Sequence, residues 1–261
     1  MSQTETLEEE SVSNGKMAMG PFEIDFDKLH GRGGAFIVTP LGYGKVFSRE
    51  QFTEEHLMFQ QTAREFGEKR ILPVREELNV LNKDLSLEIF REMGELGFLG
   101  VDVEEEYGGL ALDKTTSCII VDALSAGRNA SIMVTMSAHT GIAMLPIAWY
   151  GNDEQKKKYL SKLASGEWMG SYALTEPGAG SDALSGTTTA VLNDAGTHYI
   201  LNGQKIFVTN GGWCEVAVTF ANVDGKYTAF ILDKECDGWL IGEEEKKLGI
   251  KGSSTVTFFY E

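Results

Sequence analysis

The periodicity of the apolar residues changes once along the chain, near residue 166. Before that point they recur at three- and four-residue steps, and after it they alternate with polar residues in runs rich in Thr, Val, Ile, Phe and Tyr. The sequence therefore predicts an α+β fold, an all-α helical domain followed by an antiparallel, barrel-like β-domain. We expect a tail and irregular extension over residues 1–48, the helical domain over 49–166 and the β-domain over 167–261.

Five helices are expected in the first half. The first covers residues 52–72 and is closed by Pro73, because proline cannot continue a helix. The second begins near residue 84 and has Gly97 as its C-terminal stop. The other three are expected over residues 114–124, 131–150 and 153–164, and the last of them starts from the N-cap Asn152 or Asp153.

Five strands are expected in the second half, separated by turns of the Asn-Gly and Asp-Gly kind. They lie within residues 186–192, 198–210, 214–223, 226–233 and 254–260. The chain stops at Glu261 in what reads as a strand still in progress, and a β-domain cut there would have an open edge. We therefore expect the β-domain to be incomplete at its C-terminal end.

The net charge of −16 argues against nucleic-acid binding, because 39 acidic against 23 basic side chains repel a phosphate backbone. No run approaches about 20 uninterrupted apolar residues, so no membrane span is expected. The N-terminus is acidic and polar, unlike a secretory signal. We expect a cytoplasmic protein whose residues 1 to about 20 form a solvated tail.

The spacing of cysteine and histidine predicts neither a disulfide framework nor a metal centre. The three cysteines lie far apart without CxxC spacing, and the four histidines show no paired ligand spacing. Reduced thiols are expected. The residues concerned are Cys118, Cys214, Cys236, His30, His56, His139 and His198.

Residues 171–186, SYALTEPGAGSDALSG, are the richest in candidate chemistry. A turn with few bulky side chains places backbone N–H groups beside hydroxyls, which suits an anionic or heteroaromatic ligand. Gly178, Gly180 and Ala183 also match the G-x-G-x-x-A pattern of a dinucleotide-binding turn, but a β-type run follows where that fold has a helix. A plain Pro-Gly loop between strands remains an alternative.

The string YALTEPGAGSD resembles the signature of the acyl-CoA dehydrogenases, FAD enzymes of fatty-acid and amino-acid breakdown. Four further segments resemble that family in its order and spacing, so the resemblance extends from about Phe52 to the end of the chain. These are GELGFLGVDVEEEYGGLALD, AHTGIAMLPIAWYGNDEQKKKYLSKLASGEW, YILNGQKIFVTNGG and EEEKKLGIKGSSTV. Within the family, the sequence is most similar to the very-long-chain-like bacterial branch.

The resemblance implies a flavin site built from two segments. In the first, Thr175 would hydrogen-bond the pyrimidine edge of the isoalloxazine, and Ser181 would reach both the FAD pyrophosphate and the acyl-CoA substrate. In the second, Phe207 would pack on the flavin ring in place of the usual tryptophan, and Thr209 would reach flavin N5. The full implied set is Tyr172, Ala173, Leu174, Thr175, Gly180, Ser181, Phe207, Val208 and Thr209; for Val208, an ordinary strand end is the favoured reading.

Other conspicuous residues have structural interpretations. His139, on an apolar helix, is expected to be a satisfied core residue, and Glu176, which precedes a proline, is expected to serve local structure. Glu104, Glu105 and Glu106 are expected to face water. Helically spaced methionines at 133, 136 and 144 are expected to fill the core, and Lys156–Lys158 to form a solvated helix face.

The resemblance implies α,β-dehydrogenation of an acyl-CoA thioester to the trans-2-enoyl-CoA, as in fatty-acid β-oxidation. Hydride passes to flavin N5 and the electrons pass to an electron-transferring flavoprotein. The family's glutamate base and most subunit contacts belong to a C-terminal helical domain, so no catalytic residue is expected here and the chain alone is expected to be an inactive fragment of a homo-oligomeric enzyme. Two alternatives remain, a non-catalytic flavin- or acyl-CoA-binding or assembly protein and an acyl-CoA oxidase.

Overall fold

A computed structural model describes residues 16–19, 22–25, 28, 34, 37 and 48–261. The solvated tail predicted for residues 1 to about 20 therefore lies largely outside the described residues. Two short strands, β1 (Lys16–Met19) and β2 (Phe22–Asp25), pair as an antiparallel hairpin. Residues 54–261 form one compact unit, separate from residues 1–53.

The first predicted helix continues past Pro73. α2 (Glu54–Phe66) runs into a π-helical segment, Gly67–Ile71, then a 3-10 turn over Leu72–Val74 and the short helix α3 (Arg75–Leu78). Pro73 lies in the first turn of the 3-10 segment, where a missing backbone N–H costs least. The predicted end at Pro73 is therefore wrong.

The next two helices begin at side-chain caps. The Asn82 side chain accepts a hydrogen bond from the Leu85 N–H at the start of α4 (Lys83–Glu95), and Asp113 does the same for Thr116 at the start of α5 (Lys114–Leu124). Gly97 follows α4 with φ of +77°, in the left-handed region expected of a C-terminal stop. The predicted bounds of α5 are confirmed.

The long predicted helix over residues 131–150 contains a π-helical segment. α6 (Ala130–Ser137) leads into this segment, Ala138–Met144, and then into α7 (Leu145–Tyr150). By length and composition alone, the run Ala130–Tyr150 could cross a membrane, but more than half of its most apolar part is buried inside the structure. Such a run is weak evidence for a membrane span, because core helices pass the same test.

The helical half ends with α8 (Asp153–Ala164), capped by Asn152 as predicted. Asn152 accepts from the Gln155 N–H at 2.9 Å, while the Gln155 side chain accepts from the Asn152 N–H at 2.9 Å. This reciprocal capping box satisfies two backbone donors at the helix start.

Seven strands follow α8 and form one sheet. They are β3 (Gly170–Ala173), β4 (Thr189–Leu192), β5 (Tyr199–Thr209), β6 (Val216–Val223), β7 (Lys226–Asp233), β8 (Trp239–Ile241) and β9 (Thr255–Tyr260). Their order is β3-β6-β4-β5-β9-β8, with β7 paired on β6. The sheet is not closed into a barrel. A helical half followed by this sheet confirms the α+β fold.

The antiparallel prediction needs one correction, because the sheet is mixed. The pairs β4–β5, β5–β9, β6–β7 and β8–β9 are antiparallel, whereas β3 and β4 both pair with β6 in parallel. β3 enters directly from the helical half and is joined to the π-helical segment by the bond from the Gly170 N–H to His139, so no hairpin precedes it. With four residues, β3 is too short for an alternation signal.

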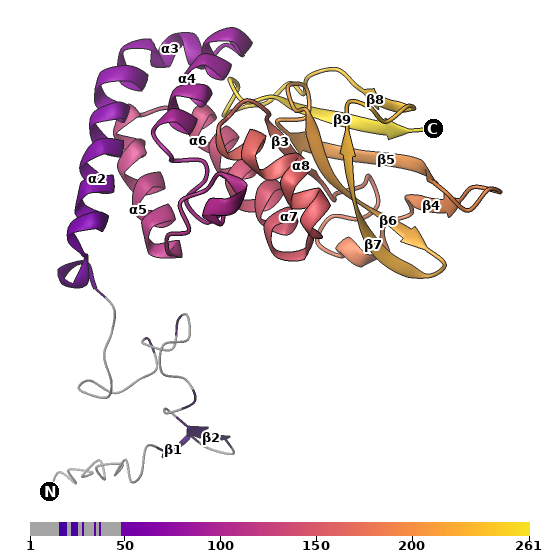
Figure 1. The fold of residues 1–261 in the computed structure, drawn as a ribbon, viewed down its shortest axis with the longest axis horizontal. Coiled ribbons are helices and arrows are strands. Elements are labelled where there is room, and N and C mark those ends of the chain that lie inside the picture. The colour runs from indigo at the N-terminus through magenta and orange to yellow at the C-terminus, as the bar shows by residue number, and fades with distance from the viewer. Residues whose placement is uncertain (1–15, 20–21, 26–27, 29–33, 35–36, 38–47) are drawn as a thin grey trace, which may run out of the picture. The chain divides into compact units, whose positions relative to one another are not determined.

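Three buried apolar clusters explain how the halves pack. One lies among the helices around Phe90 and Met93, and one lies inside the sheet around Val208 and Phe258. The third joins the halves, because residues of α7 and α8 such as Leu160 pack with residues of β6. Within residues 54–261, Figure 1 shows α2, α4 and α5 at one end, the strands at the other, and the end of β9 on the sheet side.

Candidate functional site

Residues 174–188, which include most of the segment 171–186 predicted to be richest in chemistry, leave the end of β3 and lie against β5. The Ile206 N–H donates to the Thr175 carbonyl at 2.8 Å, and Lys205 Nζ donates to the Leu174 carbonyl at 3.2 Å. The structure therefore brings together the two segments that the sequence predicted to form one site. The bond between Ile206 and Thr175 joins two backbone groups, so it fixes the path of both segments.

A buried ion pair holds this segment in place. Lys205 Nζ lies 2.6 Å from Glu176 Oε1, with the Lys205 side chain fully buried and that of Glu176 at 3% exposure. The Glu176 carboxylate also accepts from the backbone N–H groups of Thr187 and Thr188. One carboxylate thus joins β5 to both arms of the 174–188 segment.

The electrostatics of Glu176 follow from these contacts. Burial raises the pKa of the carboxyl, but the hydrogen bonds from Lys205, Thr188 and Thr187 outweigh burial and bring the pKa to about 2. Burial lowers the pKa of Lys205, and Glu176 opposes that effect. A carboxylate so strongly held in its ionised form is a poor general base.

The expected structural role of Glu176 is confirmed, whereas its partner Lys205 was missed. Lys205 follows Leu201 and Gly203 at alternate positions of β5, and a lysine at the inward position of a strand signals a buried charge in need of a partner. Thr188 was missed as well, because residues 187–189 are all threonines and the sequence does not show that only the middle one is buried.

A bulge in β5 places Phe207 on the surface. The register between β5 and β9 shifts between Lys205 and Val208, so Ile206 and Phe207 fall outside the ladder. Phe207 has φ of +57°, in the left-handed region, and its side chain is 62% exposed. An aromatic residue held in this conformation is a genuine backbone outlier, and such outliers gather at ligand sites.

The implied site residues differ in what they offer a ligand. Gly180 and Ser181 are exposed, and Thr175 and Thr209 are half-buried, so these residues can present hydroxyl and backbone groups. Ala173 and Val208 are fully buried, and Leu174 is half-buried with its carbonyl bound to Lys205. The Tyr172 ring packs edge-on against Phe220 with centroids 5.2 Å apart. Ala173 and Val208 can therefore act only through the backbone.

This surface fits the flavin cofactor that the resemblance of the sequence implies. A Cβ atom built on Gly178 or Gly180 meets no atom within 4 Å, so the loop leaves open space above its backbone. An exposed aromatic ring, several hydroxyls and accessible backbone amides suit a flat heteroaromatic ligand with an anionic tail. In the described part of the chain, no group of three or more His, Cys, Asp or Glu residues could hold a metal ion.

A second buried polar centre attaches the helices to β3. The Gly170 N–H donates to His139 Nδ1 at 2.9 Å, and His139 Nε2 lies 3.0 Å from the Leu163 carbonyl. Complete burial lowers the pKa of His139 to about 4, so the ring is neutral and Nε2 donates to Leu163. The expectation that His139 is a satisfied core residue is confirmed.

Asn210 completes this centre and was missed in the sequence. Its Nδ2 donates to the Thr135 carbonyl of α6 at 2.9 Å and to the Gly170 carbonyl at 3.2 Å. Because Asn210 directly follows Thr209, this amide holds the end of β5 against both α6 and β3. The sequence Asn-Gly-Gly at residues 210–212 predicted only a turn, and a turn signal does not reveal that the asparagine faces inward.

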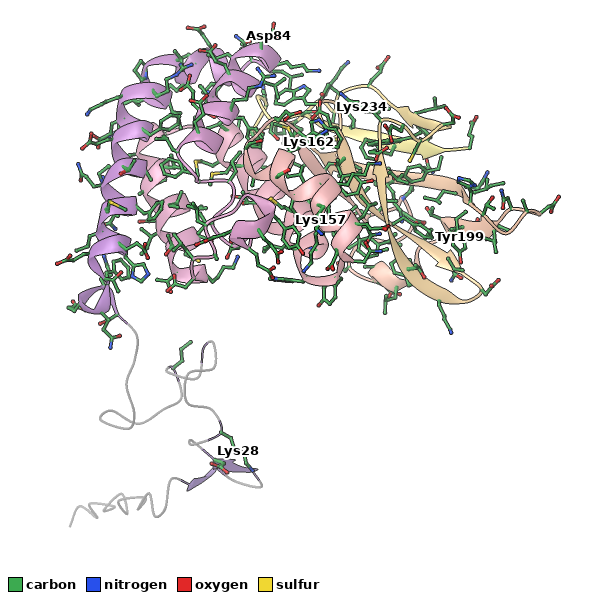
Figure 2. All side chains as sticks on the ribbon, viewed as in Figure 1. Lys28, Asp84, Lys157, Lys162, Tyr199 and Lys234 are labelled. Atoms are coloured by element: carbon green, nitrogen blue, oxygen red, sulfur yellow. The ribbon has the colours of Figure 1, made fainter. Side chains whose placement is uncertain are left out.

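The remaining structural expectations are confirmed in most places. Glu104, Glu105 and Glu106 are exposed, and Met136 and Met144 are buried. Lys157 is exposed, but Lys156 lies over the Tyr107 ring and Lys158 pairs with the buried Asp233 at 2.7 Å. Figure 2 labels Lys157 and Lys162 on α8.

Comparisons with known proteins agree with this geometry. Residues 53–167 match the family model for the N-terminal domain of acyl-CoA dehydrogenase, and residues 171–261 match the model for its middle domain. A probable acyl-CoA dehydrogenase of Bacillus subtilis is 48% identical over 231 residues, covering 88% of this chain and 39% of the relative. A short-chain specific acyl-CoA dehydrogenase of Clostridium acetobutylicum is 39% identical, covering 80% of this chain and 55% of that relative.

A solved structure is similar over the same region. The crystal structure of an acyl-CoA dehydrogenase from Bacillus anthracis, complexed with FAD, superposes with a TM-score of 0.83 and 47% identity. The match covers 88% of this chain and 40% of that chain. The chain thus spans from about two fifths to just over half of the length of these relatives.

Proposed function

The chain belongs to the acyl-CoA dehydrogenase family, and from this premise we propose that residues 174–181 and 206–209 form the FAD-holding surface of an acyl-CoA dehydrogenase. The reaction is α,β-dehydrogenation of an acyl-CoA thioester to the trans-2-enoyl-CoA, with electrons passed to an electron-transferring flavoprotein. The match to both family domains supports this proposal.

One observation carries the proposal. The hydrogen bond from the Ile206 N–H to the Thr175 carbonyl ties the bulge of β5 to the signature loop, and the exposed Phe207 ring projects from that bulge. A plain loop between strands has no need of an exposed aromatic residue in left-handed backbone. The strained Phe207 is explained if its ring is held ready for a flat ligand.

In this proposal each residue has a distinct task. Bound FAD supplies the hydride acceptor at its N5 atom. Phe207 covers the ring and excludes water, Thr175 and Thr209 orient it through their hydroxyls, and Ser181 binds the pyrophosphate and the acyl-CoA. Glu176 and Lys205 touch neither ligand and instead fix the loop that carries Thr175.

We also propose that residues 1–261 alone do not turn over acyl-CoA. The buried carboxylate of the signature loop, Glu176, is committed to Lys205, and the buried His139 is committed to Gly170 and Leu163. The complete enzyme is proposed to be a cytoplasmic homo-oligomer. Membership of the very-long-chain-like branch remains a prediction, and the relative from Clostridium acetobutylicum is named for short chains.

The test is a titration of the purified chain with FAD, followed through quenching of flavin fluorescence. We expect saturable binding that Phe207→Ala weakens at least fivefold, because the ring loses its stacking partner. The matched control is Phe259→Ala, since Phe259 is an exposed aromatic of β9 outside the site. Absence of saturable binding, or equal loss in both variants, contradicts the proposed surface.

A second measurement tests the proposed lack of turnover. Butyryl-CoA is added anaerobically to the chain in the presence of FAD, and the visible absorption of the flavin is recorded. We expect no bleaching on the time scale of enzyme turnover. Bleaching at such a rate would show that a base for the α-proton lies within this chain.

A further inference from the structure

The segment over residues 242–247, which follows β8, runs along β9. The Gly242 N–H donates to the Thr257 carbonyl and the Glu245 N–H to the Thr255 carbonyl, both at 2.8 Å. Residues 243–247 begin the stretch EEEKKLGIKGSSTV, a motif that the proposed flavin surface does not use. The segment therefore lies against the strand that pairs with the end of β5.

Lys247 in this segment is bound to the start of β9. Its Nζ donates to Thr255 Oγ1 at 2.8 Å and to the Ser253 carbonyl. The Lys247 side chain is half-buried, and burial lowers its pKa, while the carboxylate of Glu244 opposes that effect. An ammonium group can only donate hydrogen bonds, so the Thr255 hydroxyl oxygen is the acceptor in this contact.

The backbone next to this contact is held by Glu244. Its carboxylate accepts from the Thr255 N–H at 2.8 Å and from the Ser254 hydroxyl at 2.6 Å. The Ser254 Oγ in turn accepts from the Gly212 N–H at 3.0 Å. A Cβ atom on Gly212 would lie 2.6 Å from Glu244 Oε1, so this close approach needs glycine. The 242–247 segment, the start of β9 and the turn after β5 thus form one hydrogen-bonded unit.

Thr255 lies directly opposite Thr209. The two residues are partners in the antiparallel ladder of β5 and β9. The neighbouring Asn210 N–H donates to the Ser254 carbonyl at 2.9 Å. The Thr255 N–H instead turns away from β5, to Glu244. Thr209 and Thr255 are therefore a pair without mutual backbone bonds, the kind whose side chains stand closest, with Cβ atoms about 4.5–5.5 Å apart.

The lysine sets a direction for hydrogen bonding across this pair. Because the Thr255 oxygen already accepts from Lys247, its own proton is available for donation. The oxygen opposite is that of Thr209, and threonine pairs across strands form such bonds. A Thr209 hydroxyl that accepts this bond directs its own proton elsewhere, and bonds in such a chain strengthen one another.

We propose that Lys247 is a positioning residue for the flavin, at the head of a one-way hydrogen-bond relay from Lys247 through Thr255 to Thr209. The relay makes the Thr209 hydroxyl a donor to flavin N5, which in oxidised FAD can only accept. A donor aimed at N5 favours the arrival of a hydride there. Lys247 and Thr255 do not touch the flavin and act only through Thr209. This inference rests on the proposed function and adds the groups that orient its N5 contact.

The probe is FAD labelled with ¹⁵N at N5, bound to the chain and followed by ¹⁵N NMR. Accepting a hydrogen bond moves the resonance of a ring nitrogen of this type upfield. Thr209→Val removes the donor, so the downfield shift that it causes measures the full effect. We expect Lys247→Met and Thr255→Val each to give at least half of that shift, because the Thr209 proton then has no fixed direction.

Matched variants separate the direction of the relay from general damage. Lys247→Arg keeps a cation that can only donate, and Thr255→Ser keeps the hydroxyl, so both should leave the N5 resonance at the parent position. Lys246→Met removes a neighbouring exposed lysine and should also leave it there. An equal shift in Lys246→Met and Lys247→Met overturns the relay. If Lys247→Met does not fold, Thr255→Val against Thr255→Ser decides the question.

The outcomes distinguish this inference from the proposed function. If labelled FAD binds and Thr209→Val moves the N5 resonance, while Lys247→Met and Thr255→Val do not, the flavin surface stands and the relay is wrong. If the chain does not bind FAD, the proposed function fails and the relay fails with it. If FAD binds but Thr209→Val leaves the resonance unchanged, Thr209 does not donate to N5, which also overturns the relay.

Discussion

Two buried polar centres hold the sheet in place, and one is neutral while the other is charged. The His139 centre joins the π-helical segment, α8 and β3 through an uncharged ring, with Asn210 adding bonds to α6 and β3. The Glu176–Lys205 centre joins the signature loop to β5 through a full ion pair. The His139 centre attaches the helical half to the sheet, whereas the Glu176–Lys205 centre fixes only the signature loop.

The two centres respond to different ranges of pH. The folded-state pKa of His139 is about 4 against an ordinary 6.5, so between these values the unfolded chain binds more protons and stability falls as pH decreases. The folded-state pKa of Glu176 is about 2 against 4.5, so its contribution is lost between pH 4.5 and 2. On acidification the junction between the halves therefore weakens before the loop does.

The largest expected effect comes from breaking the charged centre. Lys205→Met leaves the Glu176 carboxylate buried without its cation, and we expect the free energy of unfolding to fall by about 3–5 kcal/mol in urea titrations. Lys234→Met is the matched control. Lys234, labelled in Figure 2, forms an exposed ion pair with Glu215 at 2.8 Å, which should contribute less than about 1 kcal/mol.

The double variant Glu176→Gln with Lys205→Met sharpens this result. It removes both charges, so we expect it to be more stable than Lys205→Met alone, because no unpaired charge stays buried. If the double variant loses as much free energy of unfolding as Glu176→Gln and Lys205→Met lose together, the ion pair is not what holds the loop.

The neutral centre gives the next effect. His139→Leu leaves the Gly170 N–H without its acceptor, while the Leu163 carbonyl keeps its bond from the Gly166 N–H, and we expect a loss of about 1–3 kcal/mol at pH 7. In the parent chain, His139 makes the free energy of unfolding fall by up to about 3 kcal/mol between pH 6.5 and 4. The variant should not show this fall. Unfolding free energies measured by urea at several pH values test both expectations.

His198→Gln is the control for the pH dependence, because His198 is exposed. In this variant the free energy of unfolding should still fall between pH 6.5 and 4, as in the parent chain. A parent chain whose stability is flat over that range would mean that His139 is not neutral in the fold, and the contrast between the two centres would disappear.

Most of the fold could be predicted from the periodicity, and the failures have local causes. The bounds of α5, α8 and β7 follow from the pattern and caps, since period and end signals agree there. Pro73 misled because the backbone shifts from π-helical to 3-10 geometry around it, a rearrangement that single-residue propensities do not encode. The parallel pairing of β3 depends on tertiary packing and left no local signal.

The candidate site was predicted only as far as its motif. The signature loop and the β5 segment are adjacent as expected, but the centres that hold them, built on Lys205, Thr188 and Asn210, depend on contacts between residues far apart in sequence. A buried lysine or asparagine stands out only once the inward face of its strand is known. The motif therefore predicts what the surface offers, and the fold determines what keeps it in shape.

The smallest expected effect on stability comes from the surface that both centres support. Phe207→Gly removes a side chain that is 62% exposed and relieves a φ of +57°, so we expect the free energy of unfolding to stay within about 1 kcal/mol of the parent, on the stabilising side. Phe258→Ala, a fully buried neighbour in β9, should instead lose about 3–5 kcal/mol. Urea titrations compare the two. A loss above about 2 kcal/mol in Phe207→Gly would make Phe207 a packing residue. The small change expected here, together with weakened FAD binding, would mean that the two centres hold a strained residue whose ring contributes to binding and not to folding.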